Sequence, residues 1–180
     1  KRTPVLILYE HDGKRYEKVP DKEDLKLLTK IDEYEIPTWF PTDRMPIGEE
    51  TRRNDSIGLT HIHHFFTRRN LAALACAWAN ADSLRTRFLL TSMMYKSSLL
   101  CAPLMSNYFA AKKGEARGGW VGKERSGTLY CPSIHSEVSI WSQIESRRDA
   151  VQVTAASDCL PAISTVSATE IAIPDNSIDY

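Results

Sequence analysis

Three histidines lie within four residues, at His61, His63 and His64, and their side chains are the most suited to metal chemistry. Imidazole nitrogens bind zinc, and alternate residues of a strand share one face, so two of the three could ligate one ion. A zinc site normally takes three or four protein ligands, yet no carboxylate or cysteine stands at a ligating distance along the chain. The pattern therefore favours histidines that precede a helix and hydrogen-bond to backbone or water, and no metal site is predicted.

Two short basic clusters have the same composition, Arg52-Arg53-Asn54 and Arg68-Arg69-Asn70. Guanidinium groups match phosphate oxygens in a bidentate way, so either cluster could contact nucleic acid. The charged face of an ordinary helix looks the same, and this second interpretation remains open.

A glycine-rich stretch at 112–127 has the strongest nucleic-acid character in the chain. It is net positive and contains an aromatic ring that could stack on an exposed base. The residues predicted to contact DNA are Lys112, Lys113, Arg117, Trp120, Lys123 and Arg125. The alternative is a basic loop that is only solvated.

Composition limits the wider possibilities. The 180 residues carry zero formal net charge, which excludes general polyanion binding, and 42% hydrophobic with 26% charged residues is typical of a soluble globular domain. No apolar run approaches the roughly 20 residues that span a bilayer. Isolated cysteines, at positions 76, 101, 131 and 159, indicate a reducing, cytoplasmic location rather than a disulfide framework. No nucleophile triad, phosphate-binding glycine loop or dinucleotide fingerprint is present.

The first third of the chain predicts a hairpin, a short helix and an irregular strap. Apolar runs at 5–9 and 15–19 flank Asp12-Gly13, a pair that supplies the positive φ angles of a tight turn. Asp21 is placed to cap a helix whose apolar side contains Leu25, Leu28 and Ile31. Prolines then exclude a long helix between 36 and 55, which is either a binding loop or a strap over the core.

Three longer helices follow in the sequence. Thr67 is the expected N-cap of the first helix, and Ser83 that of a second helix that runs to about residue 100 and is apolar nearly all round, as in a helix buried on most sides. These two helices are expected to form the core. The third helix is predicted to start near Ser136, with Trp141 on its apolar stripe.

The last residues, 163–180, resemble the start of a sheet: a β-branched run, a Pro174-Asp-Asn-Ser177 turn and a new apolar start at Ile178. The chain is expected to be cut there, with an open sheet edge that invites homo-oligomer formation. The predicted fold class is α+β, with an N-terminal β-hairpin, three main helices and C-terminal strands of an incomplete sheet. Its predicted parts are 1–57 (hairpin, short helix, strap), 58–156 (helices and basic loop) and 157–180 (sheet).

Several segments resemble the amino-methylating DNA methyltransferases, a family that modifies adenine N6 or cytosine N4. Pro174-Asp-Asn-Ser-Ile-Asp-Tyr180 is similar to the turn and strand that lead into the family's Asp-Pro-Pro-Phe/Tyr catalytic motif. Gly58-Leu-Thr-His-Ile-His-His-Phe-Phe-Thr-Arg-Arg-Asn-Leu71 resembles its Gly-Ile-Thr…Phe-Thr-Pro-Arg-Gln-Leu stretch. Gly127-Thr-Leu-Tyr-Cys-Pro-Ser133, followed by Glu137, resembles its Gly-Thr-Leu-Tyr-Ile-Pro segment. Residues 14–25 look like the region after a zinc ribbon in large members.

The resemblance implies a Rossmann-like methyltransferase sheet, S-adenosylmethionine as cofactor, and DNA and the remainder of the enzyme as partners. It places the catalytic motif and the main cofactor loop after Tyr180, so no catalytic residue is assigned and the piece alone is expected to be inactive. Phe66 and Thr67 correspond to an element against the methionine part of the cofactor, although Arg68 replaces the family's proline. Ser167 and Thr169 fall where the family lines the adenine pocket, but its usual Gly-Asp pair is missing.

A rival interpretation comes from a different class of protein. A noncatalytic nucleic-acid-binding or scaffolding module with a degenerate piece of the methyltransferase fold would share these segments. An Asp-Pro-Pro-aromatic motif directly after residue 180 in the parent gene distinguishes the enzyme from this module.

Overall fold

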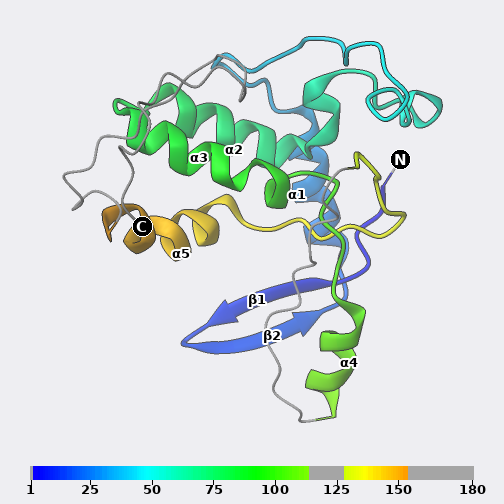
Figure 1. Cartoon of the computed structure of the whole chain (residues 1–180). Helices are drawn as coiled ribbons and strands as arrows, with labels where there is room; N and C mark the ends of the chain where they lie inside the picture. Colours follow the sequence, from blue (N-terminus) through cyan, green and yellow to red (C-terminus); the bar gives the residue numbers. More distant parts are fainter. Residues whose placement is uncertain (1, 114–127, 154–180) are drawn as a thin grey trace, which may run out of the picture.

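The computed structural model describes residues 2–113 and 128–153, which form a mixed α/β arrangement of one hairpin and several helices (Figure 1). Within these residues the two strands pair with each other and with no other strand, whereas the helices α2, α3 and α5 pack together. The elements in chain order are β1 (Ile7–His11), β2 (Lys14–Lys18), α1 (Lys22–Glu33), the short 3-10 turns η1 (Asp55–Ile57) and η2 (Ile62–Phe65), α2 (Arg68–Ala79), α3 (Leu84–Ser97), α4 (Met105–Lys112) and α5 (Ile140–Val153).

The predicted hairpin is confirmed. Asp12 and Gly13 form its two-residue turn with φ angles of 49° and 70°, the left-handed pair that matches the twist of the flanking strands. The strands are antiparallel, with Tyr9 opposite Tyr16, and the rings of these two tyrosines stack at a centroid distance of 5.3 Å. No residue of either strand is buried.

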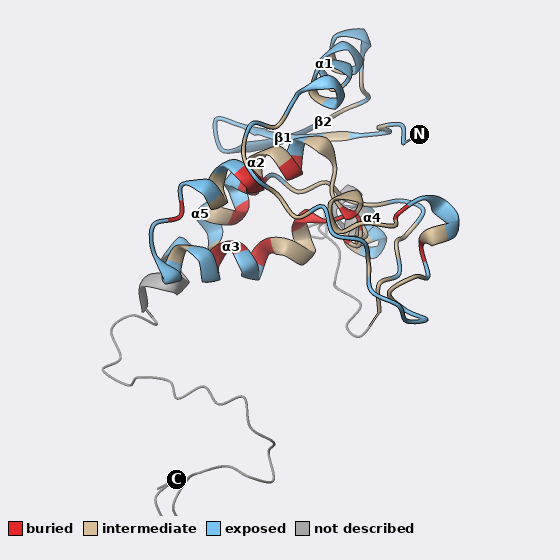
Figure 2. Ribbon diagram, turned by 90° about the horizontal axis from the view of Figure 1, so that it is seen from above, coloured by how far each residue is buried: buried red, intermediate tan, exposed pale blue. Residues whose placement is uncertain are grey.

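Helix α1 begins where the sequence predicts, because Asp21 caps it. The Asp21 side chain accepts hydrogen bonds from the backbone of Glu23 and Asp24, and the Asp24 carboxylate accepts one from the Asp21 backbone, which completes a capping box. The helix buries no residue, and Leu25, expected on its apolar side, is 43% exposed. Figure 2 shows α1 and the hairpin almost entirely in the exposed colour.

The proline-rich segment 36–55 has no helix or strand of its own before η1 begins at Asp55. It runs along η2: the backbone N–H of Met45 donates to the Thr60 carbonyl (2.9 Å), and that of Ile62 donates to the Asp43 carbonyl (3.0 Å). Met45 also packs against a small core cluster of Leu59, Phe65 and Leu99. These contacts are those of the predicted strap, although the tip of the segment stays exposed.

The main core lies between α2, α3 and α5, as predicted for the first two of these helices. Its buried side chains are Leu74, Ala81, Leu89, Leu90, Met93 and Ile140. Thr67 and Ser83 cap α2 and α3, each accepting from a backbone N–H three residues later. Burying the leucine, isoleucine and methionine side chains of this cluster contributes roughly 1.5–3 kcal/mol each.

Three helix predictions need correction. Helix α3 is buried on one side only, since Leu84 is 85% and Phe88 69% exposed. The third main helix starts at Ile140, several residues after Ser136, and its Trp141 is 68% exposed rather than on the buried stripe. Helix α4 was not predicted, so the described residues contain five α-helices.

The predicted C-terminal strands lie outside the described residues, and the Rossmann-like sheet therefore stays a prediction. Within 2–113 and 128–153, no helix is both long and apolar enough to cross a bilayer.

Candidate functional site

The junction between η2 and α2 holds the two described residues of the expected cofactor contact, Phe66 and Thr67. Both have extended backbone, with φ and ψ of −122° and 149° at Phe66 and −69° and 155° at Thr67. Thr67 is the N-cap, and its hydroxyl oxygen accepts from the backbone N–H of Asn70 at 3.2 Å. The chain therefore changes direction at a defined point, directly before the positive end of a 12-residue helix.

The segment that follows α3 packs against this junction. The Phe65 carbonyl accepts a short hydrogen bond from the Leu99 N–H (2.7 Å), and Phe66 forms an antiparallel bridge with Ser98. Phe65 is buried, and the Phe66 ring packs against both hydrophobic clusters. The segment after α3 thus holds the residues before α2 in place.

Glu137 reaches the same junction from a distant part of the chain. One of its carboxylate oxygens accepts from the Thr67 hydroxyl and from Nε of Arg69, both at 2.8 Å. The Glu137 side chain is 22% exposed, whereas that of Arg69 is 54% exposed, so solvent screens this ion pair in part. The contact with Thr67 is a charge-assisted hydrogen bond, which is shorter and stronger than a neutral one.

Asn70 anchors the base of the site. It is 2% exposed, and its amide nitrogen donates to the carbonyls of Ser97 (3.0 Å) and Val138 (3.1 Å). The Ser97 hydroxyl donates to the Met93 carbonyl and accepts from the amide of the buried Gln143 (3.0 Å). A buried polar network therefore connects α2, α3 and the start of α5, and buried polar groups of this kind must be satisfied to be tolerated.

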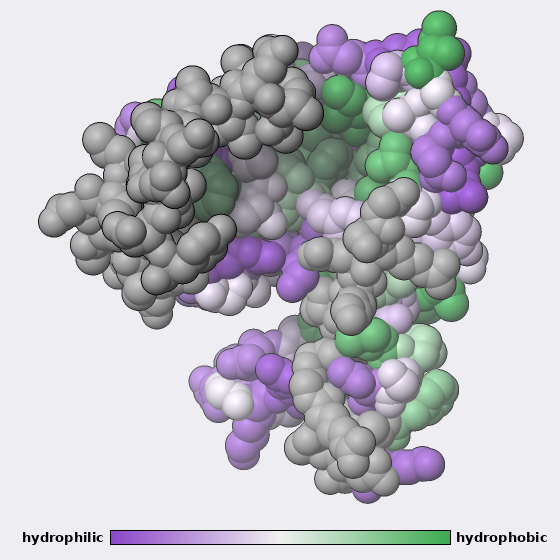
Figure 3. Space-filling view, in the orientation of Figure 1, coloured by the Kyte–Doolittle hydropathy of each residue, from purple (hydrophilic) through white to green (hydrophobic). Residues whose placement is uncertain are grey.

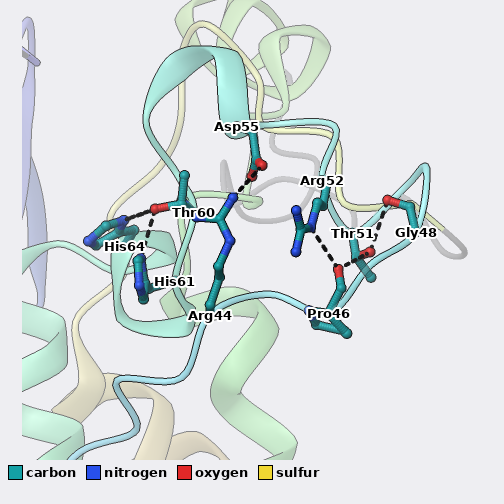
Figure 4. Close-up of polar contacts among 9 residues, drawn as sticks. All are labelled: Arg44, Pro46, Gly48, Thr51, Arg52, Asp55, Thr60, His61 and His64. Atoms are coloured by element: carbon teal, nitrogen blue, oxygen red, sulfur yellow. Dashed lines mark hydrogen bonds and ion pairs between the residues drawn. The ribbon is translucent and has the colours of Figure 1, made fainter.

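A second polar cluster lies in the strap and is drawn in Figure 4. Arg44 forms an ion pair with Asp55 (3.0 Å), and the Thr60 hydroxyl lies 2.7 Å from Nδ1 of His61. The Thr51 hydroxyl and Nε of Arg52 both donate to the Pro46 carbonyl. These bonds connect the strap to η1 and connect residues within the strap, next to the start of η2.

The three histidines lie beside the strap, at the start of and within η2. Their ring centroids lie 4.3–5.7 Å apart, yet within residues 2–113 and 128–153 no three His, Cys, Asp or Glu side chains are placed so that they could hold a metal ion. Burial lowers the pKa of His63 below its usual range, and the nearby His64 and His61 lower it further. The three rings therefore pack against one another, and His63 is the one whose neutral form burial favours.

Both arginine clusters form contacts with other residues of the same chain. Arg53 contacts Glu50 (3.1 Å) and the Thr128 hydroxyl (2.7 Å), and the buried Asn54 donates to the Leu129 carbonyl (2.7 Å). Arg68 donates from Nε to the Tyr34 carbonyl (2.8 Å). In each cluster the arginines bind neighbouring segments and the asparagine is buried, which favours a structural role over phosphate contact.

The structure describes only part of the predicted DNA-binding loop. Lys112 is the last residue of α4, and Lys113 follows it with an exposed side chain. Arg117, Trp120, Lys123 and Arg125 lie outside the described residues, as do Ser167 and Thr169 of the predicted adenine pocket.

Residue-type patterns did not identify Asn70, Gln143 or Glu137 as parts of one site. Two of them are buried polar residues on the inner faces of helices, and a search for hydrophobic periodicity does not detect buried polar residues. Glu137 entered only through the family resemblance, with no partner assigned to it.

No protein-family model matches the chain, and neither a curated protein nor a solved structure matches it.

Proposed function

We propose that this chain is the pre-catalytic part of an S-adenosylmethionine-dependent DNA methyltransferase that modifies an exocyclic amino group, adenine N6 or cytosine N4. The observation that carries the proposal is the hydrogen bond from Thr67 to Glu137 (2.8 Å). It joins two segments that resemble this family independently, the Phe-Thr element before α2 and the acid after Tyr130-Cys-Pro132.

Further contacts between the same two segments support the proposal. Arg69 shares the Glu137 carboxylate, and Asn70 donates to the Val138 carbonyl. Cys131 packs against the cluster that contains Leu59 and Phe65. Segments about 70 positions apart therefore build one rigid platform, as a cofactor-bracing region requires.

The residues at the junction suit part of the proposed cofactor. S-Adenosylmethionine supplies a methyl group on a cationic sulfur, and it carries a carboxylate on its methionine part. Phe66 is half-buried, and an aromatic ring at this position can lie against the cationic sulfur of the cofactor. The Thr67 hydroxyl already donates to Glu137 and accepts from Asn70, so its role is to hold the backbone rather than to bind the cofactor directly.

DNA would be met by the basic stretch that begins at the end of α4. A base amino group is reactive only outside the stack, so such an enzyme must extrude the base and hold the opened duplex. Replacing Lys112, Lys113, Arg117, Lys123 and Arg125 with alanine should weaken DNA binding and flatten its salt dependence, because each phosphate contact releases counterions. Unchanged DNA binding would indicate that this basic stretch is only a solvated loop.

The cofactor platform is tested by Thr67→Val in the protein encoded by the full reading frame. Loss of the bond to Glu137 should let the Phe66–Thr67 backbone move and raise the dissociation constant for S-adenosylmethionine about fivefold, because binding must then reorder the junction at a cost of about 1 kcal/mol. Thr91→Val is the matched control, because Thr91 lies on the exposed side of α3 and bonds only its own helix, at the Arg87 carbonyl. Equal affinities of the two variants for S-adenosylmethionine would show that the junction is not part of the cofactor site.

The rival noncatalytic module makes a different prediction for the same full-length protein. It binds nucleic acid without binding S-adenosylmethionine, and its reading frame lacks an Asp-Pro-Pro-aromatic motif after Tyr180.

A further inference from the structure

The strap tip, residues 46–52, is a tight loop that carries a fully projecting apolar side chain. Among the large apolar side chains that the structure describes, that of Ile47 is the most exposed, at 90%. The loop lies at one edge of the molecule, apart from α3 and α5 (Figures 1 and 2). The same edge, at the upper right of Figure 3, shows hydrophobic residues among hydrophilic ones.

Hydrogen bonds hold the strap tip closed. The Thr51 hydroxyl lies 2.9 Å from the Pro46 carbonyl oxygen and 3.1 Å from that of Gly48. The backbone N–H of Arg52 also donates to the Gly48 carbonyl, at 3.0 Å. A Cβ atom at Gly48 would lie 2.8 Å from the Thr51 hydroxyl oxygen, so a side chain there would displace this hydroxyl. The loop therefore holds Ile47 in a defined place, which lowers the entropy cost of contact with a partner.

The strap tip is also tied to the end of the predicted DNA-binding stretch. That stretch ends at residue 127, and the Thr128 hydroxyl donates to the Glu50 carboxylate (2.9 Å) and accepts from the Arg53 guanidinium (2.7 Å). Glu50 lies only three positions after Ile47. The strap tip therefore borders the part of the chain to which the proposed function assigns DNA binding.

The charges of the strap tip offset one another. Glu50 pairs with Arg53 at 3.1 Å, and Glu49 and Arg52 contribute one charge of each sign. A neutral loop releases few counterions from DNA, so the strap tip is not expected to add to the affinity for an intact duplex. Its distinctive group is the apolar side chain of Ile47, and apolar side chains enter DNA where a base step is opened.

The proposed reaction creates such an opening. The target base must leave the stack before its amino group can react, and unpairing and unstacking it costs free energy. A side chain that fills the vacated space removes its own apolar surface from water, which offsets part of this cost. An isoleucine on a closed loop beside the DNA-binding stretch meets both requirements, apolar character and a fixed position.

We propose that Ile47 enters the duplex at the position of the extruded base and prevents the opened base pair from closing. The inference rests on the proposed function, because only an enzyme that extrudes its target base creates this space.

Isoleucine variants of the protein encoded by the full reading frame test the proposal. At saturating unmethylated DNA, Ile47→Ala should lower the rate of labelled methyl transfer about tenfold, because alanine buries much less apolar surface. Its dissociation constant for DNA should stay within about twofold of the wild-type value. Ile47→Leu should keep most of the activity. Ile57→Ala is the matched control, since Ile57 is 61% exposed on η1 and should change neither rate nor affinity. Circular dichroism should show that all three variants stay folded.

A mismatched substrate separates insertion into the duplex from other roles of Ile47. Once the labelled product identifies the target base, a duplex in which that base is mismatched needs less energy to extrude it. On this duplex Ile47→Ala should methylate at a rate within about twofold of the wild-type protein.

The outcomes distinguish this inference from the proposed function. Label from the wild-type protein, with equal rates for Ile47→Ala and Ile57→Ala or with a deficit that the mismatch does not restore, would overturn the insertion of Ile47 and leave the methyltransferase proposal intact. Absence of label from the wild-type protein would overturn both.

Discussion

Asn70 should contribute more to stability than any other polar side chain near the junction. Its amide donates to the carbonyls of Ser97 and Val138 and so connects α2 with the end of α3 and the start of α5. Asn70→Ala removes two buried hydrogen bonds and leaves two carbonyls without a donor. Each lost bond costs about 0.5–1.5 kcal/mol and each unsatisfied group adds to it, so the free energy of unfolding should fall by about 2–4 kcal/mol.

Thermal and urea unfolding, followed by circular dichroism, measure this loss. For a chain of this length the midpoint should fall by roughly 5–15 °C. Asn70→Asp should cost at least as much as Asn70→Ala, because its carboxylate would face the same two carbonyls without a proton to donate.

Asn80→Ala provides the control on the same helix. Asn80 is exposed and its amide donates to a single carbonyl, that of Cys76 (2.8 Å), so this variant should lose less than about 1 kcal/mol. Equal losses at positions 70 and 80 would refute the idea that the buried network holds the three helices together.

Three further predictions follow from other contacts. A double-mutant cycle of Thr67→Val and Glu137→Gln in urea unfolding should give a coupling energy of about 1 kcal/mol, and additive effects would contradict a direct bond. Burial lowers the pKa of both His63 and His135, so as pH falls these histidines are protonated in the unfolded chain before they are in the folded one. The free energy of unfolding should therefore fall as pH drops below 6.5. The double variant His63→Gln/His135→Gln should reduce this dependence of stability on pH. Hydrogen bonds from the backbone N–H of Asp24 and from Lys18 lower the pKa of Asp21 to about 2 from 3.8, so α1 should lose its cap as pH falls through that interval. In Asp21→Asn, the protection of the α1 amides, after correction for the intrinsic pH dependence of hydrogen exchange, should no longer change with pH there.

The sequence predicted those elements whose signals are local. Asp12-Gly13 requires positive φ angles, and Asp21, Thr67 and Ser83 are cap residues with their partners three positions away, so the hairpin and three helix starts were predictable. The burial of individual side chains was harder to predict, because it depends on which other elements pack against a helix. Phe88 fits an apolar helix as well as Leu89 does, yet Leu89 belongs to the buried core cluster and Phe88 is 69% exposed.

The candidate site was predictable only in part. Thr67 was identified both as a cap and as an expected cofactor contact, but its partner Glu137 lies 70 positions away and no short-range pattern predicts that pair. For the arginine clusters the sequence left two interpretations open. Composition made them candidates for phosphate contact, whereas the fold uses Arg53, Arg68 and Arg69 to bind other segments of the chain.

The most direct test of the proposed function is transfer of a labelled methyl group from S-adenosylmethionine to DNA by the protein encoded by the full reading frame. The proposal predicts label on adenine N6 or cytosine N4, and much less label with Thr67→Val than with the control Thr91→Val. Absence of label on any DNA, from a folded protein that still binds nucleic acid, would contradict the methyltransferase proposal and favour the noncatalytic module.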